Sequence, residues 1–140
     1  MTLDDVRRAQ VVLAGVAERT PLSHSGTFSR LCGADVYFKC ENLQRTGSFK
    51  FRGAYNRLAA LSADERGRGV VAASAGNHAQ GVALAARLLG IQASVYMPET
   101  TALAKVAATQ SYGAAILLEG QTYDDAYAAA RTNPGSATFI

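Results

Sequence analysis

Short apolar runs alternate with longer helix-like stretches from residue 69 to the end of the chain. The runs, rich in small or branched apolar residues, predict strands over residues 69–74, 93–97, 114–118 and 137–140. Apolar positions at helical spacing predict helices between them, over residues 78–89, 101–112 and 122–131. Strand centres recur about every 22 residues, a spacing typical of strand–helix–strand units in a parallel sheet. We therefore expect an α/β fold of three layers, a mainly parallel open sheet with helices on both faces.

The ends of these helices carry their own signals. Gly90 and Gly113 follow the first two helices, where a left-handed terminal residue favours glycine. Thr122, followed three residues later by Asp125, matches a capping box at the start of the third. The helix over residues 78–89 contains one arginine among apolar residues, so we expect it to be deeply buried.

The first 68 residues have a less regular pattern. In chain order they predict a helix over 3–18, a short helix over 28–32, a strand over 34–41, a polar loop over 42–47 and a helix over 48–61. No linker rich in proline, glycine or serine separates this part from the alternating region. The sequence therefore gives no compositional sign of two independent domains.

Composition and charge exclude several classes of protein. Apolar residues make up 49% of the chain, which is too many for a disordered protein, and no run approaches the roughly 18 residues of a membrane span. The net charge of +3 is scattered, whereas nucleic-acid binding requires clustered basic residues. Asp4 and Asp5 precede any apolar stretch, which argues against a secretory signal. We expect no membrane and no nucleic-acid partner.

Cysteine and histidine are also informative. Cys32 and Cys40 are too few for a disulfide framework and lack the spacing of a CxxC site, so we expect reduced thiols in a cytoplasmic protein. His24 and His78 are too few for a histidine-based metal cluster. We therefore expect no bound metal.

The segment around Lys50 has an unusual placement of a primary amine. The chain has three lysines, Lys39, Lys50 and Lys105. Ser48 is a plausible N-cap, which places Lys50 in the first turn of a helix, where the dipole disfavours a cation. Phe49 and Phe51 flank the amine, and both effects would lower its pKa and make it nucleophilic. The alternative is a solvated surface lysine with its stem over Phe49.

A second candidate segment runs from Ser74 to Gly81, directly after a strand and at the start of a helix. Ligands of open α/β sheets bind at the carboxyl ends of the strands, and the free amides of a helix start favour an anion. The segment is neither a P-loop nor a GxGxxG sequence, so it does not favour a nucleotide. The alternative is an ordinary turn in which Asn77 caps the helix.

Together the two segments resemble one enzyme family. Gly47-Ser48-Phe49-Lys50 and Ser74-Ala75-Gly76-Asn77-His78, at this separation, are similar to the fold type II (tryptophan-synthase-like) pyridoxal-phosphate enzymes, and most of all to the threonine dehydratases, also called threonine ammonia-lyases. The resemblance runs in the family's order from Arg19-Thr20-Pro21-Leu22 to Lys105-Val106. It covers nearly the whole chain.

The resemblance implies roles for the matching residues. Lys50 would bind pyridoxal 5'-phosphate covalently and act as the catalytic base, Phe49 would pack on the pyridine ring, and Asn77 would bind its 3′ oxygen. The residues implied for the substrate carboxylate are Ser74, Ala75, Gly76, Asn77 and His78. The implied reaction is the deaminating elimination of L-threonine, and of L-serine, to 2-oxobutyrate or pyruvate and ammonia. That lyase would serve isoleucine biosynthesis or threonine catabolism, as a homo-oligomer.

Two alternatives remain open. Serine racemases carry a serine, which acts as a second base, where this chain has Ala75, so alanine favours elimination. The same fold also includes serine dehydratases. An alternative of another class is a non-catalytic α/β module that binds a ligand or a partner protein.

The resemblance also implies how the chain is divided. Residues 1–54 would belong to a larger domain and residues 55–140 to a smaller α/β domain. Relatives are much longer, and their glycine-rich phosphate loop lies downstream of the part that matches. We therefore expect an N-terminal fragment that is inactive alone.

Overall fold

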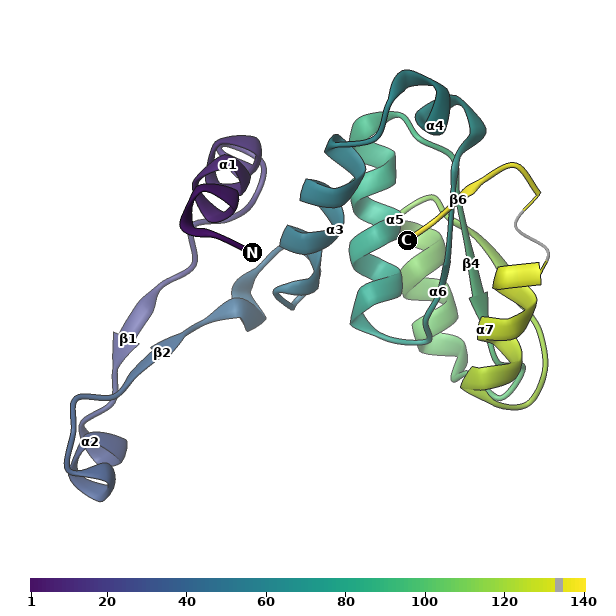
Figure 1. Cartoon of the computed structure of the whole chain (residues 1–140). Coiled ribbons are helices and arrows are strands. Elements are labelled where there is room, and N and C mark those ends of the chain that lie inside the picture. The colour runs from purple at the N-terminus through teal and green to yellow at the C-terminus, as the bar shows by residue number, and fades with distance from the viewer. Residues whose placement is uncertain (133–134) are drawn as a thin grey trace.

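A parallel sheet organises the second half of the chain. The computed structural model describes residues 1–132 and 135–140, and its four-stranded sheet has the order β5-β4-β3-β6 (Figure 1). The strands are β3 (Val70–Ala73), β4 (Ala93–Met97), β5 (Ala115–Leu118) and β6 (Thr138–Phe139). All three pairings are parallel. The α/β fold with a mainly parallel open sheet is confirmed.

Helices cover both faces of this sheet. The connecting helices are α5 (Asn77–Leu89), α6 (Leu103–Ser111) and α7 (Tyr123–Thr132). Val70 and Ala72 of β3 belong to the core that contains α5, whereas Val71 and Ala73 pack with α7 on the opposite face. Successive side chains of a strand point to opposite faces of the sheet, which explains this division. Because helices cover both faces, every residue of β3 is buried. The three-layer expectation is confirmed.

The most deeply buried helix is α5, as its sequence indicated. Seven of its thirteen residues are buried. One side packs on the sheet, and the other packs along α3 (Lys50–Ala59), which contributes Phe51, Ala54 and Leu58 to the same core (Figure 1). A helix with neighbours on opposite sides cannot carry charges on either, so an apolar sequence is required.

The helix ends follow the local signals. Gly90 and Gly113 adopt left-handed backbone conformations, with φ of 67° and 95°. Thr122 and Asp125 exchange hydrogen bonds at the start of α7, where each backbone N–H donates to the other side chain. The short helix α4 (Ala63–Arg68) begins with a capping box that joins Ser62 and Glu65. The glycine ends and the capping of α7, both expected from the sequence, are confirmed.

The N-terminal part forms an arm that extends away from the sheet. Its elements are α1 (Leu3–Leu13), β1 (Leu22–His24), α2 (Gly26–Cys32), β2 (Tyr37–Lys39) and the 3-10 turn η1 (Glu41–Leu43). β1 and β2 form an antiparallel pair with α2 at its tip (Figure 1). No helix in the described part of the chain is long and apolar enough to cross a membrane.

In the first 68 residues, three expected elements are shorter than the sequence suggested. The helix expected over 3–18 ends at Leu13, because Ala14 is extended and Gly15 adopts a φ of 72°. The strand expected over 34–41 narrows to Tyr37–Lys39, the residues that pair with β1. The helix expected over 48–61 is α3, which starts two residues later and ends two earlier. The apolar pattern alone therefore predicted each of these elements to be longer than it is.

The expected boundary between residues 54 and 55 falls within α3. Phe51 before the boundary and Leu58 after it are both fully buried in one core. Since the helix packs as a unit on α5, the packing favours a boundary ahead of α3. The assignment of the earlier residues to a larger domain stays a prediction.

The arm carries large exposed apolar side chains, and this generates a first prediction. Phe28 and Phe38 stack edge to face with centroids 5.2 Å apart, and both remain about half exposed. Leu31, three residues after Phe28 in α2, is 76% exposed. We expect the purified 140-residue chain to self-associate through this arm, because such clustered apolar surface favours association. Sedimentation of Leu31→Arg should show less association than the parent chain.

A matched control separates the arm from general hydrophobicity. Leu103 at the start of α6 is 83% exposed but lies outside the arm. Leu103→Arg should therefore leave the association unchanged. A parent chain that sediments as a monomer at high concentration would contradict the prediction.

Candidate active site

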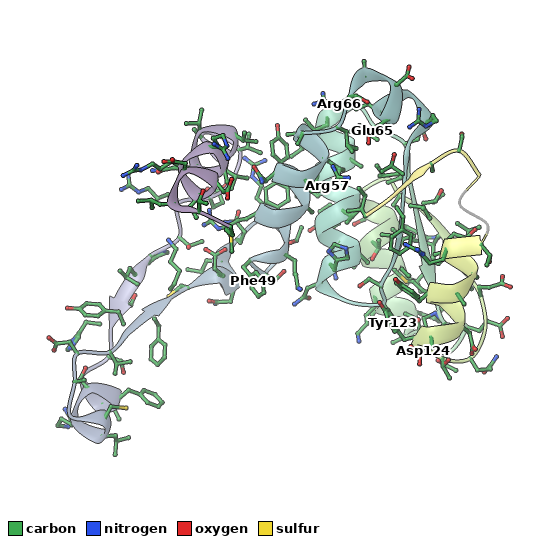
Figure 2. The ribbon with its side chains drawn as sticks, viewed as in Figure 1. Phe49, Arg57, Glu65, Arg66, Tyr123 and Asp124 are labelled. Carbon is green, nitrogen blue, oxygen red and sulfur yellow. The ribbon has the colours of Figure 1, made fainter. Side chains whose placement is uncertain are left out.

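Lys50 is the first residue of α3. Phe49 occupies the N-cap position, and no side chain caps the helix (Figure 2 shows Phe49 at this end of α3). The prediction that Ser48 caps the helix is wrong: its hydroxyl is buried and finds no hydrogen-bond partner among the described residues. The prediction that Lys50 lies in the first turn is confirmed.

The amine of Lys50 contacts one phenylalanine and not two. Its Nζ lies 5.2 Å from the ring centroid of Phe49, whose side chain is 60% exposed. Phe51 is fully buried in the core, so it faces away from the amine. The amine is therefore exposed and open to a ligand, and the expected flanking by two rings is wrong.

The segment after β3 lies at a reversal in the order of the sheet. From β3 the chain proceeds to β4 and β5 on one side, and then returns through α7 to β6 on the other. A crevice forms at such a switch point, beyond the carboxyl ends of the strands. Ser74, Ala75 and Gly76 occupy this position. Sequence and topology thus lead to the same candidate site.

Local hydrogen bonds fix the shape of this segment. The N–H of Ser74 donates to the carbonyl of Tyr96 over 3.1 Å, and the N–H of Gly76 donates to Ser74 Oγ over 3.3 Å. Gly76 is the N-cap of α5, which has no side-chain cap, and Asn77 is the first, exposed residue of the helix. The alternative in which Asn77 caps α5 is therefore wrong. The first amides of α5 stay available to an anionic group.

His78 connects this segment to Lys50. Its half-buried ring lies near the positive charge of Lys50 and hydrogen-bonds to the backbone of Ile140 after β6. Burial lowers the pKa of the imidazole most, the contact with Ile140 raises it, and the charge of Lys50 lowers it further. The net effect is a lowered pKa, which favours the neutral ring. The structure thus brings the two predicted segments together.

A polar network at the start of α3 has no counterpart in the sequence interpretation. Arg52 makes two hydrogen bonds of 2.8 Å to the carboxylate of Glu41, which also accepts from Thr20 over 2.6 Å. Arg52 further donates to the carbonyl of Glu18 over 2.9 Å. This network joins the base of the arm to α3, two residues after Lys50. The partners are up to 34 residues apart, so no local spacing identified them.

The charge of Glu41 is strongly stabilised by this network. Hydrogen bonds from Arg52 are the main cause, and Thr20 and the charges of Arg52 and Lys39 add to it, so they outweigh desolvation and lower the pKa of Glu41 from 4.5 to about 2. The side chain of Glu41 is 16% exposed and that of Arg52 is 30% exposed, so solvent screens the pair only in part.

An accessible lysine amine beside a loop of small residues, at the carboxyl edge of a parallel sheet, is the architecture of an α/β enzyme that binds a carbonyl compound with anionic groups. Residues 13–138 match the family described as "Pyridoxal-phosphate dependent enzyme". The chain belongs to this family, whose cofactor is pyridoxal phosphate.

Named relatives and solved structures are similar to this chain. It is 55% identical to the L-threonine ammonia-lyase of Thermotoga maritima over 130 residues, which are 93% of this chain and 32% of that protein. Among solved structures, the processed form of threonine deaminase isoform 2 from Solanum lycopersicum aligns with a TM-score of 0.86 and 39% identity. The alignment covers 100% of this chain and 40% of the deaminase chain. The serine racemase from Dictyostelium discoideum aligns with a TM-score of 0.91 and 34% identity. The alignment covers 100% of this chain and 46% of the racemase chain.

The chain spans about a third of the length of the curated relatives it matches. Within that part, the fold type II architecture agrees with the solved structures. The roles of the individual site residues stay predictions.

The network around Glu41 generates the second prediction. Because the folded-state pKa of Glu41 lies below its unfolded value, its charge stabilises the fold above pH 4.5 and loses this effect as the pH falls toward about 2. Glu41→Gln should lower the free energy of unfolding by about 2 kcal/mol near neutral pH. The difference from the parent protein should shrink across this acid window in denaturant titrations.

Asp64 supplies the matched control. It is 95% exposed and lies 3.7 Å from Arg68. Asp64→Asn should change the free energy of unfolding by less than about 0.5 kcal/mol, because exposed ion pairs contribute little. A difference between Glu41→Gln and the parent protein that persists unchanged below pH 2 would rule out the assigned cause.

Proposed function

We propose that the protein carrying this chain is a pyridoxal-phosphate-dependent ammonia-lyase that acts on L-threonine, with L-serine as a second substrate. The observation that carries this proposal is the exposed Lys50 amine at the start of α3, a helix that packs on α5 directly after the loop over 74–78. The names of its relatives support the choice of threonine. In this reaction the substrate loses its β-hydroxyl and its amino group, and the products are 2-oxobutyrate and ammonia.

The residues present fit the cofactor of the family. Lys50 supplies an exposed primary amine for its aldehyde, and Phe49 an exposed ring beside that amine. Asn77 supplies an exposed amide at the start of α5, suited to the 3′ oxygen. When bound, pyridoxal phosphate stabilises the negative charge left at Cα after its proton is removed.

The chain's own residues would bind the substrate and move its proton. The uncapped N–H groups at the start of α5 would donate hydrogen bonds to the substrate carboxylate. The residues beside the carboxylate would be Ser74, Ala75, Gly76, Asn77 and His78. Small side chains allow a close approach of ligand to backbone. The neutral ring favoured for His78 uses its one N–H on the backbone of Ile140, so its other nitrogen would act as an acceptor and would add no second positive charge. Lys50 Nζ would take the proton from Cα.

Racemisation is the second candidate, since the serine racemase structure aligns closely. Racemisation requires a proton donor on the face of Cα opposite Lys50. Ala75 has no ionisable or hydroxyl group, and it lies within the loop over 74–78. Elimination needs no second base, so the alanine favours the lyase.

The wider setting of the enzyme is also a proposal. Scattered charge and the free thiols of Cys32 and Cys40 support a cytoplasmic location. The exposed apolar arm supports assembly into a homo-oligomer. The reaction would serve isoleucine biosynthesis or threonine catabolism.

Replacement of Lys50 tests the proposed function directly. In the full-length gene product, Lys50→Ala should lower the turnover of L-threonine by at least about a thousandfold, because both the covalent attachment and the base are lost. The measurement is 2-oxobutyrate formation. Lys105→Ala, an exposed lysine on α6, is the control and should keep normal turnover.

Borohydride reduction provides the mapping experiment. The parent protein treated with pyridoxal phosphate and borohydride should carry the label at Lys50. Normal turnover by Lys50→Ala, with the label at Lys39 or Lys105, would refute the proposal.

A substitution at Ala75 tests the choice between lyase and racemase. Ala75→Ser should raise the ratio of D-serine to pyruvate formed from L-serine at least about tenfold, because it supplies a second proton donor. Ala75→Gly, which supplies none, is the control. A parent enzyme that racemises L-serine as fast as it eliminates water would contradict the role given to Ala75.

A further inference from the structure

The helices α3 and α5 approach each other closely at Gly81. A Cβ atom on Gly81 would lie 3.1 Å from the carbonyl carbon of Lys50, 3.1 Å from the backbone nitrogen of Phe51 and 3.3 Å from the carbonyl oxygen of Lys50. These distances are shorter than ordinary contacts between carbon and backbone atoms. A residue with a Cβ at this position would press on the backbone of the proposed catalytic lysine.

Gly81 is not explained by its own backbone conformation. It lies inside α5, and it is not among the glycines with positive φ in the described part of the chain. Glycine is less favourable than alanine inside a helix. The requirement for glycine here therefore comes from the neighbouring helix.

We propose that Gly81 is a positioning residue that sets the place of Lys50 relative to the loop over 74–78, an inference that rests on the proposed function. Gly81 lies four residues after Asn77, so the two residues occupy the same face of α5, one turn apart. The backbone of Lys50 rests against that face at Gly81. The closeness of the two helices at this crossing thus determines where the Lys50 amine lies with respect to Asn77.

The surrounding core decides which part of the structure would move. Phe51 and Leu58 of α3, and Val82 and Ala86 of α5, are at most 1% exposed. Such packed side chains resist displacement. The added methyl group would meet the peptide that joins Lys50 to Phe51, and of these two residues Lys50 is the exposed one, at a helix end that no side chain caps. A methyl group at Gly81 would therefore displace the start of α3, and Lys50 with it.

Stability and positioning should respond differently to this change. Alanine favours the helix, which offsets part of the steric cost of the added methyl group. Helix propensity does not offset a shift of the reacting amine. A misplacement of about 1 Å can lower a reaction rate a hundredfold. We expect Gly81→Ala to keep most of its stability and to lose reactivity at Lys50.

The experiment compares Gly81→Ala with the parent full-length gene product. The Lys50 amine condenses with the aldehyde of pyridoxal phosphate and releases water, and borohydride then reduces the new C=N bond to a stable amine. Mass spectrometry of the digested protein measures the rate of labelling at Lys50 per folded molecule. The rate at saturating cofactor should fall about tenfold in Gly81→Ala. Thermal unfolding of the cofactor-free proteins measures the folded fraction.

Gly53→Ala is the matched control. Gly53 lies in α3, three residues after Lys50, and a Cβ there would meet nothing within 4 Å. This variant should label at the parental rate and unfold at an equal or higher temperature.

The outcomes separate the two proposals. Equal labelling of Lys50 in the folded fractions of Gly81→Ala and the parent would overturn this inference alone, since Gly81 would then have a structural role only. Absence of label at Lys50 in the parent protein would overturn the proposed function, and this inference with it.

Discussion

Burial of α5 between the sheet and α3 is the constraint on which the rest of the structure depends. Its residues Val82, Ala83 and Ala86 are almost fully buried. Because α5 begins directly after β3, its position also fixes the loop over 74–78 at the carboxyl edge of the sheet. The candidate site is thus a by-product of the core: two helices that must pack together bring their first residues together.

The polar network of Glu41 and Arg52 complements this apolar packing. It holds the base of the arm against the first turn of α3. Apolar burial is non-directional, whereas a two-point contact between guanidinium and carboxylate fixes orientation. Lys50 is next to both: Phe51 packs in the apolar core, and Arg52 pairs with Glu41. The site therefore depends on contacts from both parts of the chain.

Local signals in the sequence predicted the parallel sheet, the burial of α5 and most helix ends, because period, caps and glycine positions depend on neighbours in the chain. The expected cap by Ser48 failed because tertiary packing buries its hydroxyl in a loop. The contact of Gly81 with Lys50 and the pair of Glu41 with Arg52 depend on how distant segments meet. The two motifs identified Lys50 and Asn77 as candidates, but not the contacts that hold them.

Lys50 and Phe51 are consecutive residues with opposite surroundings, one exposed and the other fully buried. In a random mutational screen scored by growth or turnover, substitutions at these neighbours would fall in the same class of inactive variants. Their causes would differ, since one change removes an amine and the other leaves a cavity in the core. Protein abundance in the cell would separate them, because a cavity variant is degraded while an intact protein without its amine accumulates.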